Sequence, residues 1–142
     1  MDLLLSKVLV DVKNMESLDP QQRQVLERGG VVDITTVGRK SGKPRRIEIV
    51  FHNIDGRIYI SGMPRPEKRS WLANLEADER FTLHLKGPAR ADLPARARVI
   101  IDESERRPLL AAVARAWKRN DLETMVAQSP LIEVMLEDRA AA

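Results

Sequence analysis

The sequence contains no cysteine, few aromatic residues and no long apolar run, and each of these absences excludes a class of protein. Without cysteine there is no disulfide, no thiolate nucleophile and no zinc or iron–sulfur site built on sulfur. No run of about 18 apolar residues occurs, so we expect no transmembrane segment. No basic region precedes the short apolar run at residues 3–5, so we expect no signal peptide. These features together predict a cytoplasmic protein.

An excess of one charge sign is also nearly absent. The chain has 24 Lys and Arg residues against 21 Asp and Glu residues, a formal net charge of +3. Such a balance does not favour nucleic acid as the partner of the whole chain, and an aromatic content of 4% is low for a surface that stacks bases. With 142 residues, 43% of them hydrophobic, the chain is expected to form one domain over residues 1–142.

Hydrophobic periodicity predicts a mixed α+β chain. Helical spacing is expected over residues 3–28, with Asp19-Pro20 starting a short second helix, and over residues 68–77, 104–118 and 121–128. Strand patterns are expected over residues 31–37, 46–52, 57–61, 81–85, 89–101 and 131–136. Such a set of short antiparallel strands, with helices at the ends and one between strands, tends to close into a barrel because closure removes unpaired edges.

Local signals refine this outline. Asp55-Gly56 predicts a tight hairpin. Pro94 is expected to interrupt its strand with a bulge or an edge, and Ser104 is expected to cap the helix that follows. Phe81, Leu83 and Leu85 should point into the core. His52 and His84 occupy polar-face positions and could be neighbours across the sheet; without a paired carboxylate motif they are better explained as structural residues than as metal ligands.

The cationic loop, residues 38–46, is the first segment that carries chemistry. Five of its nine residues are cationic and none is acidic. Gly38 and Gly42 would let backbone N–H groups turn toward an anion, Ser41 adds a hydroxyl donor, and arginine provides a planar fork for phosphate oxygens. The segment lacks the glycine and lysine spacing of a P-loop. A solvated basic hairpin with no ligand is the alternative, of about equal weight.

A second segment, residues 61–71, follows a strand and leads into a helix. It carries Arg65, Lys68 and Arg69 just before Trp71. Cations near a helix N-terminus are typical of an anion site. The alternative is an ordinary connection in which Trp71 anchors the helix in the core.

The order of these motifs resembles the deazaflavin-dependent nitroreductase family. The resemblance rests on the run from Thr35 to Arg45, on the Asp55-Gly56 hairpin, on a strand ending at Ser61-Gly62, and on Trp71-x-x-Asn74-Leu75 before a strand from Phe81. It covers roughly residues 25–101. It implies a split β-barrel, related to oxidases that bind flavin mononucleotide. It also implies the deazaflavin coenzyme F-420 as cofactor and hydride transfer to nitroaromatics, quinones or other electron-poor acceptors.

The resemblance also implies which residues bind the cofactor. Those implied to hold its phosphate and acidic tail are Arg39, Lys40, Ser41 and Arg45; those implied to flank its ring system are Ser61, Gly62, Met63 and Trp71. The further residues that we expect to bind the cofactor are Gly38, Gly42, Ile47, Lys68 and Arg69. The chain departs from the family where Ile47-Glu48-Ile49 replaces threonine-proline-leucine. The C-terminal tyrosines of the family are also missing, since the single tyrosine is Tyr59. The resemblance therefore does not identify the electron acceptor of this chain.

The sequence thus predicts a deazaflavin-dependent reductase. The cofactor carries the hydride, and the protein binds and orients the cofactor and excludes water, with no side chain required as general acid. Flavin mononucleotide is the alternative cofactor, although five cations are generous for one phosphate. A non-catalytic module that binds a cofactor or nucleic acid is the alternative from another class. The expected partner is a small-molecule electron acceptor, and a homo-oligomer is left open.

Overall fold

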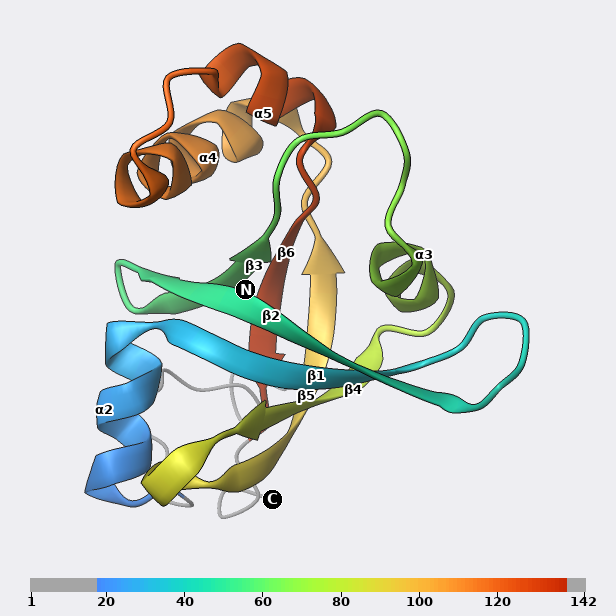
Figure 1. Cartoon of the computed structure of the whole chain (residues 1–142), viewed down its shortest axis with the longest axis vertical. Coiled ribbons are helices and arrows are strands. Elements are labelled where there is room, and N and C mark those ends of the chain that lie inside the picture. Colours follow the sequence, from blue (N-terminus) through green and yellow to red (C-terminus); the bar gives the residue numbers. More distant parts are fainter. Residues whose placement is uncertain (1–17, 138–142) are drawn as a thin grey trace, which may run out of the picture.

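The computed structural model describes residues 18–137, which form a closed barrel of six antiparallel strands with helices around it (Figure 1). The order around the barrel is β1-β2-β3-β6-β5-β4. The strands are β1 (Gly30–Val37), β2 (Pro44–Ile54), β3 (Arg57–Ser61), β4 (Arg80–Leu85), β5 (Ala91–Val99) and β6 (Leu131–Leu136). The helices are α2 (Pro20–Arg28), α3 (Ser70–Ala77), α4 (Glu103–Trp117) and α5 (Leu122–Gln128), with a short 3-10 turn, η2 (Gly87–Ala89). The predicted α+β barrel is confirmed; of the helical stretch expected over residues 3–28, residues 3–17 lie outside the described residues.

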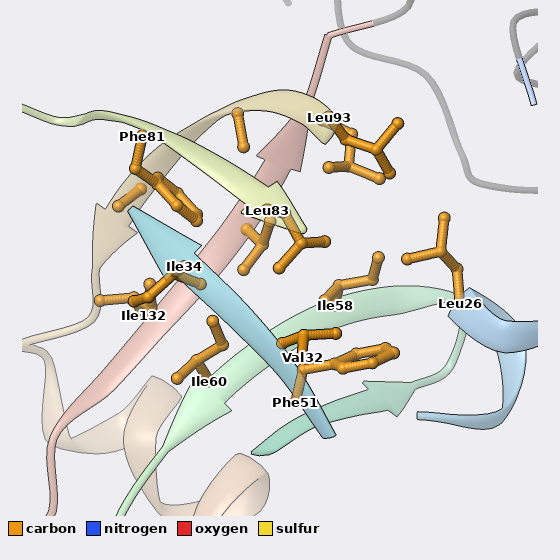
Figure 2. Close-up of a cluster of buried hydrophobic side chains, with 14 of the residues drawn as sticks. Leu26, Val32, Ile34, Phe51, Ile58, Ile60, Phe81, Leu83, Leu93 and Ile132 are labelled. Carbon is orange, nitrogen blue, oxygen red and sulfur yellow. The ribbon is translucent and has the colours of Figure 1, made fainter. Parts of the chain in front are cut away.

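Alternation along each strand sends one set of side chains into the barrel, where they form the main core (Figure 2). Phe81, Leu83 and Leu85 all lie inside it, as their alternation predicts. The Asp55-Gly56 hairpin between β2 and β3 is also confirmed, since both residues have positive φ, 53° and 87°. Two-residue hairpins favour this conformation because its twist matches that of the strands.

A second apolar cluster lies outside the barrel, where α4 and α5 cover one end of it (Figure 1). Arg106 joins these elements. Its guanidinium donates to the carbonyl oxygens of Ile100 at 2.9 Å, Val126 at 3.0 Å and Ser129 at 2.6 Å. Carbonyl groups at a helix C-terminus have no partner within the helix, so Arg106 satisfies the end of α5 and fixes it against the start of α4.

Pro94 does not interrupt its strand, contrary to the sequence prediction. β5 runs without a break through Pro94, which pairs with Thr82 of β4. On the other side the β6 ladder ends at Leu136, opposite Ala95, and the Pro94 carbonyl oxygen accepts from the Glu137 N–H at 3.1 Å. The nitrogen of Pro94 therefore faces the end of β6, where the ladder needs no further donor.

The two histidines are not neighbours, also contrary to expectation. His52 pairs with Tyr59 across β2 and β3, whereas His84 lies on β4 between Asp33 and Asp92. β2 and β4 flank β1 on opposite sides. Within residues 18–137 no group of three or more His, Asp or Glu side chains is placed to hold a metal ion.

The cap of α4 is Asp102, and Ser104 is not the cap that the sequence predicts. The Asp102 carboxylate accepts from the Ser104 N–H at 3.0 Å and from the Ser104 hydroxyl at 2.9 Å.

Asp102→Ala should therefore lower the free energy of unfolding by about 1 kcal/mol, because it removes the acceptor for an unpaired helix N–H. Ser104→Ala should cost less, because the backbone bond remains. Urea denaturation of both variants tests this, and a larger loss for Ser104→Ala would contradict it.

Candidate cofactor-binding site

The cationic loop comprises the connection between β1 and β2, residues 38–43, and the first three residues of β2; its turn extends beyond the barrel below α3 (Figure 1). Backbone hydrogen bonds between residues of the loop fix its conformation. The Gly38 N–H donates to the Lys43 carbonyl oxygen at 2.8 Å, and the Gly42 N–H donates to the Gly38 carbonyl oxygen at 2.8 Å. A Cβ at Gly38 would lie 2.6 Å from the Ser41 hydroxyl oxygen and 3.1 Å from the Lys43 carbonyl oxygen, so a larger residue there would require the Ser41 side chain and the turn to shift.

These bonds correct the expectation of a backbone anion nest. Besides Gly38 and Gly42, the Lys43 N–H donates to the Ser41 hydroxyl oxygen at 3.1 Å, and the Arg39 N–H donates to the Asn74 amide oxygen at 3.1 Å. Four backbone N–H groups of the loop are thus already bonded. The loop therefore offers an anion its cationic side chains and the Ser41 hydroxyl proton, and backbone donors contribute less than predicted.

A cavity of about 390 Å³ opens between the cationic loop and α3. Its lining combines predicted residues with three that sequence reasoning did not select, Thr36, Ser70 and Asn74. The predicted residues that the structure brings together here are Gly38, Arg39, Lys40, Ser41, Arg45, Ile47 and Trp71. Trp71, 9% exposed, and the half-buried Ile47 give the cavity an apolar wall, opposite hydroxyls and cations.

Among the described residues, the cations that line this cavity have no carboxylate partners. Fourteen ion pairs join side chains within residues 18–137, and none of them includes Arg39, Lys40 or Arg45. Arg46, at the end of the same loop, differs because its Nε atom lies 2.9 Å from the Asp33 carboxylate. Unpaired cations around a concave surface create a positive potential that attracts an anion.

Asn74 connects the loop to α3. It is 4% exposed, and its amide oxygen accepts from the Arg39 N–H at 3.1 Å and from the Arg39 guanidinium at 3.2 Å. Its amide nitrogen donates to the Thr36 hydroxyl oxygen at 3.1 Å. A buried amide with its oxygen and nitrogen both bonded holds one geometry, so Asn74 fixes Arg39 at the edge of the cavity.

The cations of the second segment, Arg65, Lys68 and Arg69, do not line this cavity, although Ser70 and Trp71 of the same segment do. The Lys68 ammonium lies 2.7 Å from the Glu76 carboxylate. The Arg69 guanidinium donates to the Met63 carbonyl oxygen, and burial lowers the pKa of Arg69. The other predicted residues outside the cavity lining are Ser61, Gly62, Met63 and Gly42. The Ser61 hydroxyl donates to the Pro130 carbonyl oxygen at 2.7 Å, and Met63 is 52% exposed. A cofactor role for these residues stays a prediction.

Glu48, which stands where the family has proline, points away from the cavity. Its carboxylate lies 2.5 Å from the Lys86 ammonium, and Lys86 also lies 2.7 Å from the Asp33 carboxylate. Alternation along β2 puts Ile47 on the inner side of the barrel wall and Glu48 on the outer side. The substitution therefore adds no negative charge to the cavity.

Asn74→Asp should weaken binding of an anionic cofactor roughly tenfold, or about 1.4 kcal/mol. The carboxylate can keep the bonds to Arg39 and accept one from the Thr36 hydroxyl, so the fold should survive, but it neutralises Arg39 and repels phosphate. Ala77→Asp, which adds the same charge at the exposed end of α3, is the control. Calorimetric titration measures both. Equal affinities for Asn74→Asp and the parent would show that Asn74 and Arg39 lie away from the bound cofactor.

A closed six-stranded barrel with a cationic cavity beside it defines the class of split-barrel cofactor-binding proteins. The chain belongs to the F420H(2)-dependent quinone reductase family, whose model matches residues 10–137. Coenzyme F-420 is therefore its cofactor, and the chain is an oxidoreductase. The unpaired cations at the cavity fit the phosphate and the acidic tail that the sequence resemblance implies. No curated protein sequence matches this chain at a significant level.

Solved structures support the fold. An F420-H2 dependent reductase (FDR-A) is 22% identical, with a TM-score of 0.57 over 74% of this chain and 93% of that one. A pyridoxinephosphate oxidase family protein from Clostridium acetobutylicum is 12% identical, with a TM-score of 0.63 over 89% and 86%. A putative pyridoxamine 5'-phosphate oxidase from Listeria innocua is 16% identical, with a TM-score of 0.57 over 80% and 88%. None of the described helices is long and apolar enough to cross a membrane.

Proposed function

We propose that this chain transfers hydride from reduced coenzyme F-420 to a quinone. The observation that carries the proposal is the cavity of about 390 Å³ lined by Arg39, Lys40 and Arg45, none of which has a carboxylate partner within residues 18–137. The family match supports the cofactor and favours a quinone over a nitroaromatic as acceptor. Flavin mononucleotide, with one terminal phosphate, is the less favoured cofactor.

Some side chains that line the cavity provide positive charge or a hydrogen-bond donor, and others provide an apolar surface. Arg39 and Arg45 provide guanidinium forks for phosphate oxygens, and Lys40 adds a point charge for the acidic tail. The Ser41 hydroxyl has its proton free to donate, because its oxygen already accepts from the Lys43 N–H at 3.1 Å. Trp71 and Ile47 form the apolar wall against which a ring system would lie with water excluded.

The reduced cofactor supplies the hydride, and the protein supplies binding and orientation. Reduction of a quinone to a hydroquinone also consumes a proton. The described residues that line the cavity include hydroxyls, an amide and cations, with no carboxylate or imidazole among them. Solvent water is therefore the proton source in this proposal, and none of these side chains is asked to act as a general acid.

The test has two stages. Coenzyme F-420 and flavin mononucleotide are first titrated separately into the protein while tryptophan fluorescence is recorded, because Trp71 lines the cavity. Reduced F-420 is then mixed anaerobically with 2-methyl-1,4-naphthoquinone or with 4-nitrobenzoate, and the return of the oxidised cofactor is followed. Tight binding with faster oxidation by the quinone supports the proposal. Oxidation by the nitroaromatic alone would overturn the acceptor, and tighter binding of flavin mononucleotide would overturn the use of the cavity.

A further inference from the structure

Met63 is the most exposed methionine among the residues that the structure describes. It lies in the β3–α3 loop, residues 62–69, which runs from the end of β3 to α3 (Figure 1). Its exposed fraction is 52%, whereas Met125 of α5 is fully buried and Met135 of β6 is half-buried. A thioether is oxidised to a sulfoxide where an oxidant can reach its sulfur, so among these three side chains Met63 is the one that an oxidant in solution reaches first.

A guanidinium is held against this sulfur. Arg119, in the connection between α4 and α5, donates from Nη1 to the Met63 Sδ atom at 3.3 Å. The other edge of the guanidinium is occupied, because Nε donates to the Asp121 carboxylate at 2.9 Å and Nη2 donates to the second oxygen of that carboxylate. The Arg119 N–H also donates to the Ala114 carbonyl oxygen at 2.9 Å, which fixes its backbone at the end of α4. The Nη1 donor therefore reaches Met63 from a fixed position.

The reduced side chain of Met63 uses this donor poorly. The sulfur of a thioether is a weak acceptor, and it has two lone pairs, so the bond to Arg119 leaves one of them available to an oxidant. Oxidation converts the thioether into a polar sulfoxide, whose oxygen carries the negative end of the S–O dipole. A charged donor bonds to such an oxygen roughly twice as strongly as a neutral donor does. The position of Arg119 thus suits the oxidised side chain better than the reduced one.

The main chain of Met63 connects this contact to the start of α3. Its carbonyl oxygen accepts from the Arg69 guanidinium, and Arg69 directly precedes Ser70 and Trp71, which line the cofactor cavity. Packing around Arg69 is close, because a Cβ at Gly62 would lie 3.3 Å from its guanidinium carbon. A firmer hold on the Met63 side chain therefore restrains the β3–α3 loop up to the first turn of α3.

We propose that Met63 is a site of reversible oxidation by hydroperoxides, and that Arg119 binds the sulfoxide and fastens the β3–α3 loop to the α4–α5 connection. In the step itself a sulfur lone pair attacks one peroxide oxygen, and the S–O bond forms as the O–O bond breaks. Sulfur is oxidised by two electrons, and hydrogen peroxide is reduced to water. The site does not depend on the cofactor, because neither Met63 nor Arg119 lines its cavity.

The first test locates the oxidation. The protein without cofactor is treated with increasing concentrations of hydrogen peroxide, digested and mapped by mass spectrometry. Met63 should gain one oxygen faster than Met135 and about tenfold faster than Met125, and the methionine sulfoxide reductases should remove it. Earlier oxidation of Met125 or Met135 would overturn the assignment, as would an oxygen on Met63 that the reductases leave in place.

The second test measures the loop. Hydrogen–deuterium exchange of a peptide that contains residues 62–69 is compared before and after oxidation of Met63. Exchange should slow about fivefold in the oxidised parent, the effect of one net hydrogen bond. Arg119→Gln removes the charged donor, so oxidation should no longer slow exchange in that variant. Arg115→Gln, which removes the same charge from the last turn of α4, is the control and should respond as the parent does.

Met63→Leu has no sulfur at this position, so peroxide should leave exchange of its loop unchanged, and this variant serves if Arg119→Gln does not fold. Exchange in the oxidised parent that is unchanged or faster would overturn the proposal. So would equal slowing in the parent and in Arg119→Gln, since the sulfoxide would then be held by another group.

Discussion

Leu83→Ala is expected to lower the free energy of unfolding by about 2–5 kcal/mol. Leu83 lies in β4 with an exposed fraction of 0%, between Ile34 of β1 and Leu93 of β5, and all three side chains belong to the core of the barrel. Truncation there leaves a void that close-packed neighbours on both sides can fill only in part. Urea denaturation monitored by circular dichroism measures the loss.

The control for this variant is Leu109→Ala, the same truncation at a partly buried position on α4. Its cost in unfolding free energy should be clearly smaller. Part of the Leu109 side chain is already in contact with water, so the truncation removes less buried apolar area. A denaturation midpoint for Leu83→Ala equal to that of the parent would mean that the faces of β4 are reversed relative to the structure.

The prediction for Leu83 could be made from sequence, because alternation over residues 81–85 determines which side chains share a face. Closure of the barrel could not be predicted from alternation in the same way. The barrel closes where β1 pairs with β4 and β3 with β6, and the latter joins Ser61 to Leu131. Local patterns carry no register for partners this distant in the chain, so the prediction of closure rested on the general cost of unpaired edges and on the family resemblance.

The cationic loop could be recognised in the sequence because its composition is unusual. The residues that complete its cavity were missed because nothing in the composition around them is unusual. Thr36 follows the inward alternation of Val32 and Ile34, and Asn74 lies three residues after Trp71 on one face of α3. Residues three apart on a helix are neighbours, so the position of Trp71 already indicated Asn74. No local signal indicated that the partner of Asn74 would be Arg39.

Charge pairing was the least predictable feature. Lys68 and Arg69 look available in the sequence, but the fold brings Glu76 to Lys68 and the Met63 carbonyl group to Arg69. The sequence therefore suggested two cationic groups for the cofactor tail. Within residues 18–137, the cations of the loop that have no carboxylate partner are Arg39, Lys40, Lys43 and Arg45, whereas Arg46 is paired with Asp33. We accordingly expect Lys68→Ala to change cofactor affinity little, contrary to what the sequence suggests.

Arg39→Ala and Arg45→Ala should each weaken binding of coenzyme F-420 by about 1.5–3 kcal/mol, roughly 10- to 150-fold. Both side chains line the cofactor cavity, and neither has a carboxylate partner within the described residues, so each is free to bond a phosphate or carboxylate oxygen of the cofactor. Arg39→Ala also removes the guanidinium that donates to the buried Asn74 oxygen, whereas the backbone N–H of residue 39 still donates to it. The double variant should lose less than the sum, because both arginines act on one anionic group.

Calorimetric titration at low and high salt measures these losses, with flavin mononucleotide titrated in parallel. Arg115→Ala, which removes one exposed cation from α4 far along the chain from the loop, is the control for net charge and should leave affinity unchanged. The parent should prefer coenzyme F-420, and the preference should shrink as salt screens its acidic tail. If both loop variants bind coenzyme F-420 as the parent does, the cationic loop is only a solvated hairpin and the cofactor binds elsewhere on the barrel.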